Sequence, residues 1–115
     1  MEQERRKTPR VVVPGLRVAY RSGARLLSQE VLDVSPRGAF ICDDHPPPVG
    51  RRLWLDFHLA PGIGWSAFGD VVWVRARAAR STAEAPGMGV SLATLEEAAV
   101  EAIARMLEGF PTEAR

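Results

Sequence analysis

Two groups of residues in this chain have the types and spacing needed to hold an anionic ligand. The first is a basic cluster near the N-terminus, in which Arg6 and Arg10 are separated by three residues and Arg5 and Lys7 flank Arg6. Guanidinium groups keep their charge and can hold phosphate oxygens through two parallel hydrogen bonds. The cluster therefore suits a phosphate group, although a solvated basic tail has the same composition.

The second group is the sequence Asp-Val-Ser-Pro-Arg-Gly at residues 33–38, which lies between two apolar runs. Asp33 and Ser35 can bond to nearby backbone N–H groups. Gly38 can adopt a positive φ, or it can let a ligand approach the backbone closely. A plain hairpin turn and a ligand-binding turn both fit these residues.

Cys42, Asp43, Asp44 and His45 form a third candidate, because each of these side chains can bind a metal ion. Adjacent residues at the end of a strand point to alternate sides, so the four cannot all converge on one ion. We expect a solvated turn here and no metal site.

The other candidates do not indicate catalysis. His58 has no carboxylate or nucleophile partner evident in the sequence. Trp54, Trp65 and Trp73 could line a pocket, but large aromatic side chains in a chain of 115 residues are more often in the core. We therefore expect that the chain is not an enzyme.

Short β-favouring runs separated by Gly, Pro, Asp and Ser must position these groups. The runs are residues 11–13, 16–20, 30–34, 39–42, 53–59, 68–77 and 88–92. Leu53, Leu55, Phe57 and Leu59 fall on alternate positions, which predicts a strand with one buried face. The run 68–77 is apolar on both faces, so we expect that strand to be covered on both sides.

After these runs the apolar spacing changes to that of an amphipathic helix. The apolar stripe consists of Leu95, Ala99, Ala102, Ile103, Met106, Leu107 and Phe110. Thr94 followed by Glu97 matches a capping box, and Gly109 with Pro111 is a plausible stop. The pattern predicts a helix over residues 94–108.

Six or so antiparallel strands without helices between them cannot form βαβ units, so they must close into a barrel or stack as a sandwich. We predict an all-β fold, a small six-stranded antiparallel β-barrel with a C-terminal amphipathic helix against one end or side. Residues 1–10 are predicted to form a flexible basic arm, and residues 11–110 a single domain.

Composition is consistent with one small globular domain. The chain has 115 residues, of which 46% are hydrophobic, and Cys42 is its single cysteine, which excludes an internal disulfide. Residues 1–25 carry seven basic and two acidic side chains, whereas residues 93–115 carry two basic and five acidic ones. Because no apolar run is long enough to span a bilayer and the N-terminus is polar, we expect a cytoplasmic protein with no membrane span.

Arg6-x-x-x-Arg10 followed by Asp-x-Ser-x-x-Gly at residues 33–38, in an all-β chain of this length, resembles the PilZ domain family. The resemblance covers residues 5–108 and includes landmarks at residues 46–50, 69–74 and 87–90. Members of that family are bacterial receptors for the second messenger cyclic di-GMP. The resemblance implies a small barrel whose arm folds across one outer face and encloses the ligand.

The implied ligand is cyclic di-GMP, with no further cofactor. The implied site consists of Arg5, Arg6, Arg10, Asp33, Ser35, Arg37 and Gly38. Arginine can hold the phosphates or the guanine O6/N7 edge and can stack on the base, while Asp33 can accept from guanine N1–H or N2–H₂.

The resulting hypothesis is a receptor that reports ligand to an unidentified partner protein when its arm becomes ordered. Two alternatives remain. One is a PilZ-like adaptor that acts without nucleotide, for example in motility or pilus assembly. The other is non-specific nucleic-acid binding through the basic arm, which predicts steep salt dependence and no preference among cyclic dinucleotides.

Overall fold

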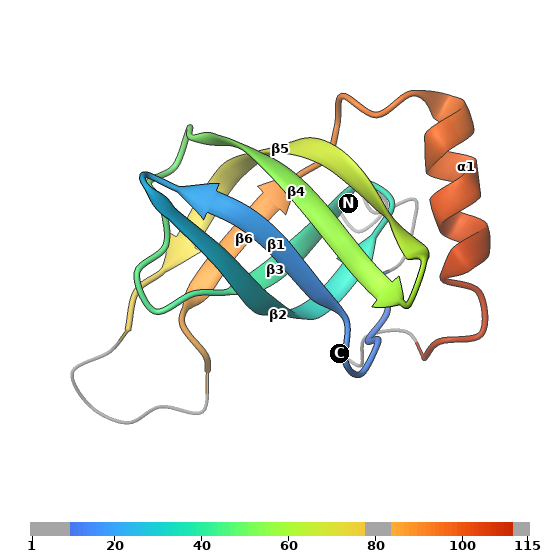
Figure 1. Cartoon of the computed structure of the whole chain (residues 1–115), viewed down its shortest axis with the longest axis horizontal. Helices are drawn as coiled ribbons and strands as arrows, with labels where there is room; N and C mark the ends of the chain where they lie inside the picture. The colour runs from blue at the N-terminus through green and yellow to red at the C-terminus, as the bar shows by residue number, and fades with distance from the viewer. Residues whose placement is uncertain (1–9, 78–83, 112–115) are drawn as a thin grey trace, which may run out of the picture.

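The computed structural model describes residues 10–77 and 84–111, and over this part of the chain it forms a closed barrel and one helix (Figure 1). The strands are β1 (Arg17–Ser22), β2 (Arg25–Ser35), β3 (Gly38–Cys42), β4 (Arg52–Ala60), β5 (Ile63–Arg75) and β6 (Gly87–Ser91), and the helix is α1 (Glu97–Met106). Neighbouring strands pair antiparallel in the order β1-β2-β3-β6-β5-β4, and β4 pairs with β1. The predicted barrel with a C-terminal helix is confirmed.

Glycine allows the tight turns of two hairpins. Gly23 lies between β1 and β2 with a φ of 64°, and Gly62 lies between β4 and β5 with a φ of 74°. Residues with a side chain rarely adopt this left-handed conformation. Both turns are short, and the strands pair from the residues that flank them, Ser22 with Arg25 and Ala60 with Ile63.

Closure of the sheet divides the side chains of each strand into an inner set and an outer set. Val18 and Tyr20 of β1 and Leu55 and Phe57 of β4 face inward and are almost completely buried. The alternation predicted for residues 53–59 is therefore confirmed.

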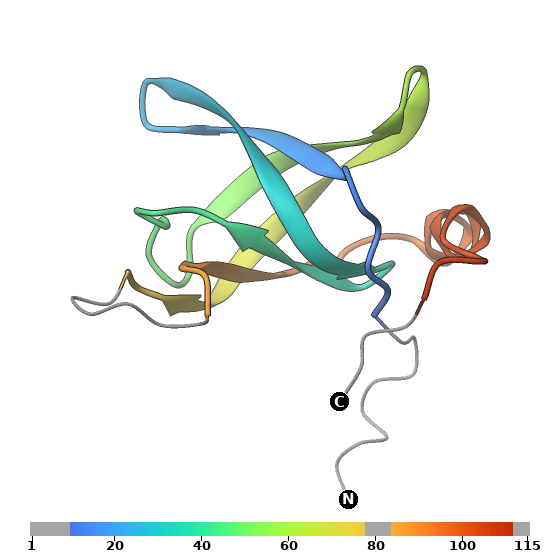
Figure 2. The same cartoon turned by 90° about the horizontal axis from the view of Figure 1, so that it is seen from below.

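The two ends of the barrel differ (Figures 1 and 2). At one end α1 lies against the barrel, and Ile103 of the helix and its C-cap residue Leu107 belong to the same core cluster as Leu16 and Phe57. We call this the covered end. At the opposite end, β1 turns into β2 and β3 runs into residues 43–51. We call this the open end, because a cavity lies there.

The predicted start of the helix is wrong by three residues. The helix begins at Glu97, its N-cap residue is Glu96, and no side chain caps its first turn. The reason is a preceding turn in which the Leu95 N–H donates to the Leu92 carbonyl at 3.1 Å. Thr94 lies within that turn and cannot serve as the N-cap.

The expectation that residues 68–77 are covered on both sides is also wrong. Phe68 and Val72 of β5 are 49% and 50% exposed, whereas Ala67 and Val71 on the other face are buried. The barrel wall is a single sheet, and α1 covers an end of it, so the outer face of β5 meets solvent.

None of the described helical residues forms a segment long and apolar enough to cross a membrane.

The predicted solvated turn at residues 42–45 is wrong for Asp43, which is only 6% exposed. Its Oδ2 accepts a hydrogen bond from the Tyr20 hydroxyl at 2.5 Å, and its Oδ1 accepts one from the His45 backbone N–H at 2.8 Å. Burial and the neighbouring carboxylate both raise the pKa of Tyr20, so its hydroxyl stays protonated and continues to donate.

We expect Tyr20→Phe to lower the free energy of unfolding by about 1–3 kcal/mol, because a buried carboxylate loses one of its two donors. Urea denaturation measures the change. Ser66→Ala is the matched control, since it removes an exposed hydroxyl that bonds to the half-buried Asp56. It should cost less than about 0.5 kcal/mol. Equal effects of the two variants would contradict the structural role of the buried pair.

Candidate ligand-binding surface

The motif turn, residues 33–38, joins β2 to β3 at the covered end of the barrel. Ser35 pairs with Gly38, which leaves Pro36 and Arg37 as the two residues of the turn. A two-residue turn between paired strands holds its flanking side chains in a fixed geometry. The polar groups of the motif therefore lie on a rigid hairpin.

A bulge in β2 turns Asp33 toward the outer surface. Val31 and Val34 are both buried, and the pairing register shifts between Val31 and Asp33. Strict alternation from Val31 would turn Asp33 into the barrel, but the extra residue of a bulge reverses the sides that follow it. Asp33 consequently lies opposite Phe40 on the outside of the sheet.

Arg10 lies beside Asp33 because the next residue pairs with β2. The Val11 N–H donates to the Val34 carbonyl at 2.8 Å, and the Val34 N–H donates back to Val11 at 3.0 Å. Arg10 Nη1 then donates to Asp33 Oδ1 at 2.6 Å, with side chains only 20% and 14% exposed. Arg10 of the basic cluster and Asp33 of the motif turn are therefore in direct contact.

Ser35 and Arg37 have structural contacts of their own. The Ser35 hydroxyl accepts a hydrogen bond from the Arg37 backbone N–H at 3.1 Å, and Ser35 is 4% exposed. The Arg37 guanidinium donates to Glu97 of α1 at 3.2 Å, and the Arg37 carbonyl accepts from the Leu92 N–H at 2.9 Å. The motif turn is thus connected to both the start of the helix and the segment before it.

Gly38 has no positive φ, so a turn conformation is not the reason for glycine at this position. A Cβ here would lie 2.9 Å from the Val90 carbonyl oxygen and 3.4 Å from Nη2 of Arg10. The position needs glycine because β6 and Arg10 both approach the backbone closely. The expected positive φ is therefore wrong, and the expected close approach of a ligand stays a prediction.

Beside the motif turn lies a stacked group that the sequence analysis did not identify as part of a site. Asp33, Phe40, Gly89 and Trp73 lie opposite one another on β2, β3, β6 and β5. The rings of Phe40 and Trp73 stack with centroids 5.2 Å apart, and the Arg75 guanidinium lies 4.7 Å from the Phe40 ring centre. A Cβ at Gly89 would overlap the Trp73 indole, so glycine allows the ring to lie across the strand.

The signal that could have revealed this group is the alternation of Gly87 and Gly89 in β6, opposite a strand that carries Trp73. Glycines on alternate positions of a strand leave one face without side chains, and a large ring can lie on that face. The outer surface next to Asp33 is therefore flat, aromatic and cationic.

Arg5 and Arg6 lie outside the described residues. Arg10, Asp33, Ser35 and Gly38 are brought together at the covered end, whereas the Arg37 side chain is turned toward α1.

Among residues 10–77 and 84–111, no group of three or more His, Cys, Asp or Glu side chains is arranged to hold a metal ion. Burial raises the pKa of the Cys42 thiol, as does the charge of Glu30.

Only one of the three tryptophans packs against the core as expected. Trp65 stacks on Phe57, with ring centroids 4.9 Å apart. Trp54 and Trp73 are 49% and 42% exposed, so for them the expectation is wrong. Trp54 occupies an outer position of β4, where it meets the ring of Phe68 edge to face at 4.7 Å. The pairing of β5 with β6 shifts register between Val71 and Trp73, so the buried Val71 and the exposed Trp73 lie on opposite faces.

Comparisons with known proteins agree with this architecture. A family model described as PilZ domain matches residues 4–109. Among solved structures, the chain is similar to the PilZ domain with c-di-GMP of YcgR from Escherichia coli. That match has a TM-score of 0.70 and 13% sequence identity, and it covers 92% of this chain and 91% of the other. No curated protein sequence matches the chain.

We expect Gly38→Ala to lower the free energy of unfolding by about 1–3 kcal/mol, because the added methyl group forces the β3 and β6 backbones apart. Urea denaturation measures the loss of stability. The Nε–H resonance of Arg10 in NMR spectra reports displacement of the ion pair. Unchanged stability together with an unchanged Arg10 resonance would show that the close approach at Gly38 does not constrain the site.

Proposed function

The chain belongs to the PilZ domain family, whose members are generally non-catalytic binding domains, and we propose that it is a receptor for cyclic di-GMP. The observation that carries the proposal is the 2.6 Å contact between Arg10 and Asp33. This contact joins Arg10, the last residue of the Arg6-x-x-x-Arg10 spacing, to the acid of the motif turn. The similar structure from Escherichia coli is described with the same nucleotide, which supports the choice of ligand.

The chemistry of the surface suits this ligand. Cyclic di-GMP carries two phosphates and two guanines, so its receptor needs fixed positive charge, donors and acceptors for a purine edge, and flat faces. Arg10 supplies charge, and the part-buried Asp33 supplies an acceptor. Trp73 and Arg75 offer flat groups on which a base can stack. Arg5 and Arg6 would add phosphate contacts from the arm.

The ion pair holds the site ready for ligand. Asp33 uses Oδ1 to hold Arg10, which leaves the other carboxylate oxygen to accept from guanine. Arg10 bonds to Asp33 through Nη1, and its remaining N–H groups can reach a phosphate oxygen. Because both side chains are fixed before the ligand arrives, binding loses little side-chain entropy at these positions.

Transmission to a partner protein is the second part of the proposal. Ligand held by Arg5, Arg6 and Arg10 would order the arm against the barrel, which changes the surface presented at the covered end. Arg37 offers a second route, because its ion pair with Glu97 links the motif turn to α1. Displacement of Arg37 by ligand would release the start of the helix.

An adaptor that acts without nucleotide is the alternative favoured by a specific observation. Trp54 and Phe68 are each 49% exposed on the outer faces of β4 and β5. Exposed aromatic side chains of this size are enriched at protein interfaces. One calorimetric titration with cyclic di-GMP, with cyclic di-AMP as the control, separates the hypotheses. Saturable heat with the first ligand alone supports the receptor, and no heat with either supports the adaptor.

We expect Arg10→Ala and Arg6→Ala each to weaken cyclic di-GMP binding at least about tenfold, equivalent to about 1.4 kcal/mol. A charge-assisted contact contributes about 1.5–3 kcal/mol, and both variants remove one. Calorimetry measures the affinity. Arg17→Ala is the matched control, because Arg17 bonds to Ser28 away from the motif turn. Parental affinity in both site variants would show that these arginines do not hold the ligand.

We expect Asp33→Ala to lower cyclic di-GMP affinity and to reduce the preference for it over cyclic di-AMP. Phosphate contacts cannot distinguish the two ligands, so discrimination requires a group that reads the base edge. A carboxylate accepts from guanine N1–H or N2–H₂, whereas adenine presents an unprotonated N1 and no amino group at C2. Arg10→Ala should instead lower both affinities with less effect on their ratio.

Asp56→Ala provides the control for the loss of an outer carboxylate, because Asp56 bonds to Ser66 on β4 and β5. Each variant is first shown to melt cooperatively, since Asp33 also holds Arg10 in place. If a folded Asp33→Ala protein keeps the parental guanine preference, the reader of the base is another group, such as Ser35, Arg37 or the backbone near Gly38.

We expect cyclic di-GMP to increase the amide-exchange protection of the part of the predicted arm, residues 1–10, that precedes Arg10, because that segment has little apolar surface to hold it to the barrel without ligand. Arg10 itself already pairs with Asp33 without ligand, so the expected flexibility is wrong for this residue. Hydrogen exchange with and without ligand measures the change. Protection of β4 serves as the internal reference. Equal protection of residues 1–10 in both states would exclude arm ordering while leaving the binding proposal intact.

A further inference from the structure

The open end of the barrel contains a cavity of about 260 Å³ that lies away from the motif turn. Its position follows from the strand register. Tyr20 faces inward, and the paired positions on β1 and β2 place Ser22, Arg25 and Leu27 on the same inner side. Near the mouth of the barrel the inward-facing side chains include polar and charged ones as well as apolar ones. Mouths of β-barrels are common places for small ligands.

One wall of the cavity is a carboxylate held in a fixed position. Asp43 accepts hydrogen bonds from the Tyr20 hydroxyl and from the His45 backbone N–H, one on each oxygen. Gln29 lines the same cavity from β2, where it lies opposite Val18 and two positions from the partner of Tyr20. Each carboxylate oxygen can accept a second hydrogen bond. The Tyr20 pKa is raised, so its proton remains on the hydroxyl and Asp43 remains the acceptor.

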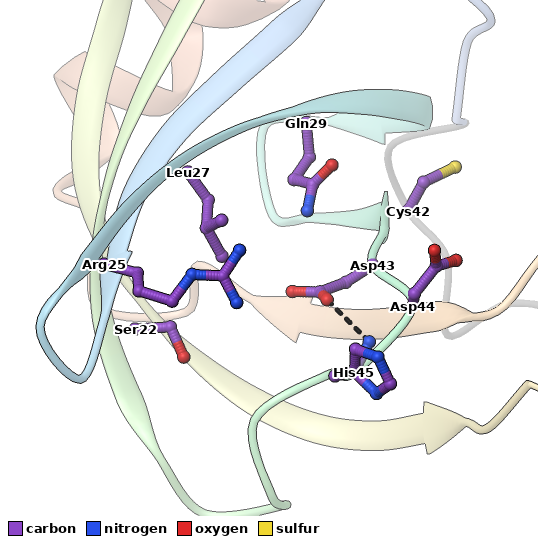
Figure 3. Close-up of a pocket in the computed structure, with 8 residues that line it drawn as sticks. All are labelled: Ser22, Arg25, Leu27, Gln29, Cys42, Asp43, Asp44 and His45. Atoms are coloured by element: carbon purple, nitrogen blue, oxygen red, sulfur yellow. Dashed lines mark hydrogen bonds between the residues drawn. The ribbon is translucent and has the colours of Figure 1, made fainter.

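The opposite wall is a guanidinium group. Figure 3 shows the Arg25 guanidinium facing the Asp43 carboxylate, with the Gln29 amide directed toward the same space. Arg25 forms no ion pair or side-chain hydrogen bond with any other described residue. The Arg25 and Asp43 charges therefore face each other across the cavity without contact.

A ligand with one sign of charge does not satisfy this arrangement. An anion on Arg25 would face the carboxylate of Asp43, and a cation on Asp43 would face the guanidinium of Arg25. Asp44 does not alter this balance, since it pairs with Arg77 at 2.5 Å. Figure 3 shows both Cys42 and Asp44 directed away from the space between Arg25 and Asp43. A molecule that carries both charges a few atoms apart satisfies both walls together.

We propose that the open end binds a small zwitterion of the α-amino acid class, with its carboxylate on Arg25 and its ammonium group on Asp43. Gln29 supplies a further amide group to orient the ligand, and Leu27 lies beside the bound molecule as an apolar contact. The proposal is independent of cyclic di-GMP binding, because the cavity shares no residue with the motif turn or with Arg10.

The test is an NMR titration of the ¹⁵N-labelled full chain with three probes of similar size. L-Alanine carries both charges, propionate lacks the ammonium group and ethylamine lacks the carboxylate. We expect L-alanine to produce saturable amide shifts confined to residues 22–29 and 42–45. Propionate and ethylamine should each bind at least about fivefold more weakly. An absence of saturable shifts with L-alanine, or equal affinity for propionate, would overturn the proposal.

Two arginine variants locate the site. Arg25→Gln should weaken L-alanine binding at least about fivefold, because it removes the partner of the carboxylate. Arg21→Gln is the matched control, since Arg21 lies on β1 one position away from the inner side and is exposed. Both positions are exposed, so neither variant should impair folding. Equal effects of the two variants would overturn the assignment to the open end.

Asp43→Asn tests the other wall, and its fold is checked first because Asp43 is buried and bonded to Tyr20. A folded variant should lose its preference for L-alanine over propionate. If Asp43→Asn does not fold, the ethylamine and propionate comparison on the parent protein decides the same point. Retention of the full preference in a folded variant would overturn the role of Asp43.

Discussion

Closure of the sheet by the pairing of β1 with β4 is the constraint on which the other features depend. The inside of a closed barrel is filled by apolar side chains of its own strands. Polar groups therefore lie on the outer surface or at the two ends. The motif turn and Arg10 lie on the outer surface at the covered end, where Ile103 of α1 and the C-cap residue Leu107 cover the core. The opposite end has no such seal among the described residues, and its inner positions become polar at Arg25 and Gln29.

Within that frame, two backbone hydrogen bonds determine where the ligand surface forms. The reciprocal bonds between Val11 and Val34 attach the end of the arm to β2 and so place Arg10 within reach of Asp33. The ion pair is largely shielded from water, which strengthens the attraction but also leaves Asp33 dependent on its partner. Ligand that draws Arg10 toward a phosphate must therefore supply Asp33 with donors of its own, and guanine has such donors on the edge that adenine lacks.

The fold could be predicted largely from the sequence, because the alternation at residues 53–59 and the glycine turns are local signals. The helix start could not, since the Leu92 to Leu95 turn that displaces Thr94 depends on how the chain leaves β6. The bulge that turns Asp33 outward is likewise a tertiary effect, because it lets Val31 and Val34 both face the core. Local sequence also could not show that Asp43 is buried, since its partner Tyr20 lies on another strand.

A closed barrel limits how a signal can leave the ligand surface. Moving any one strand breaks ladder hydrogen bonds on both of its edges, so the barrel wall resists displacement. Helix α1 lies outside this closed ladder and is linked to the motif turn by the exposed ion pair of Arg37 and Glu97. Such a pair contributes little stability on its own, so a ligand that attracts Arg37 can break it readily. A ligand at the motif turn would therefore act more readily on α1 than on the barrel wall, and the open end, on the far side of that wall, shares no residue with the motif turn.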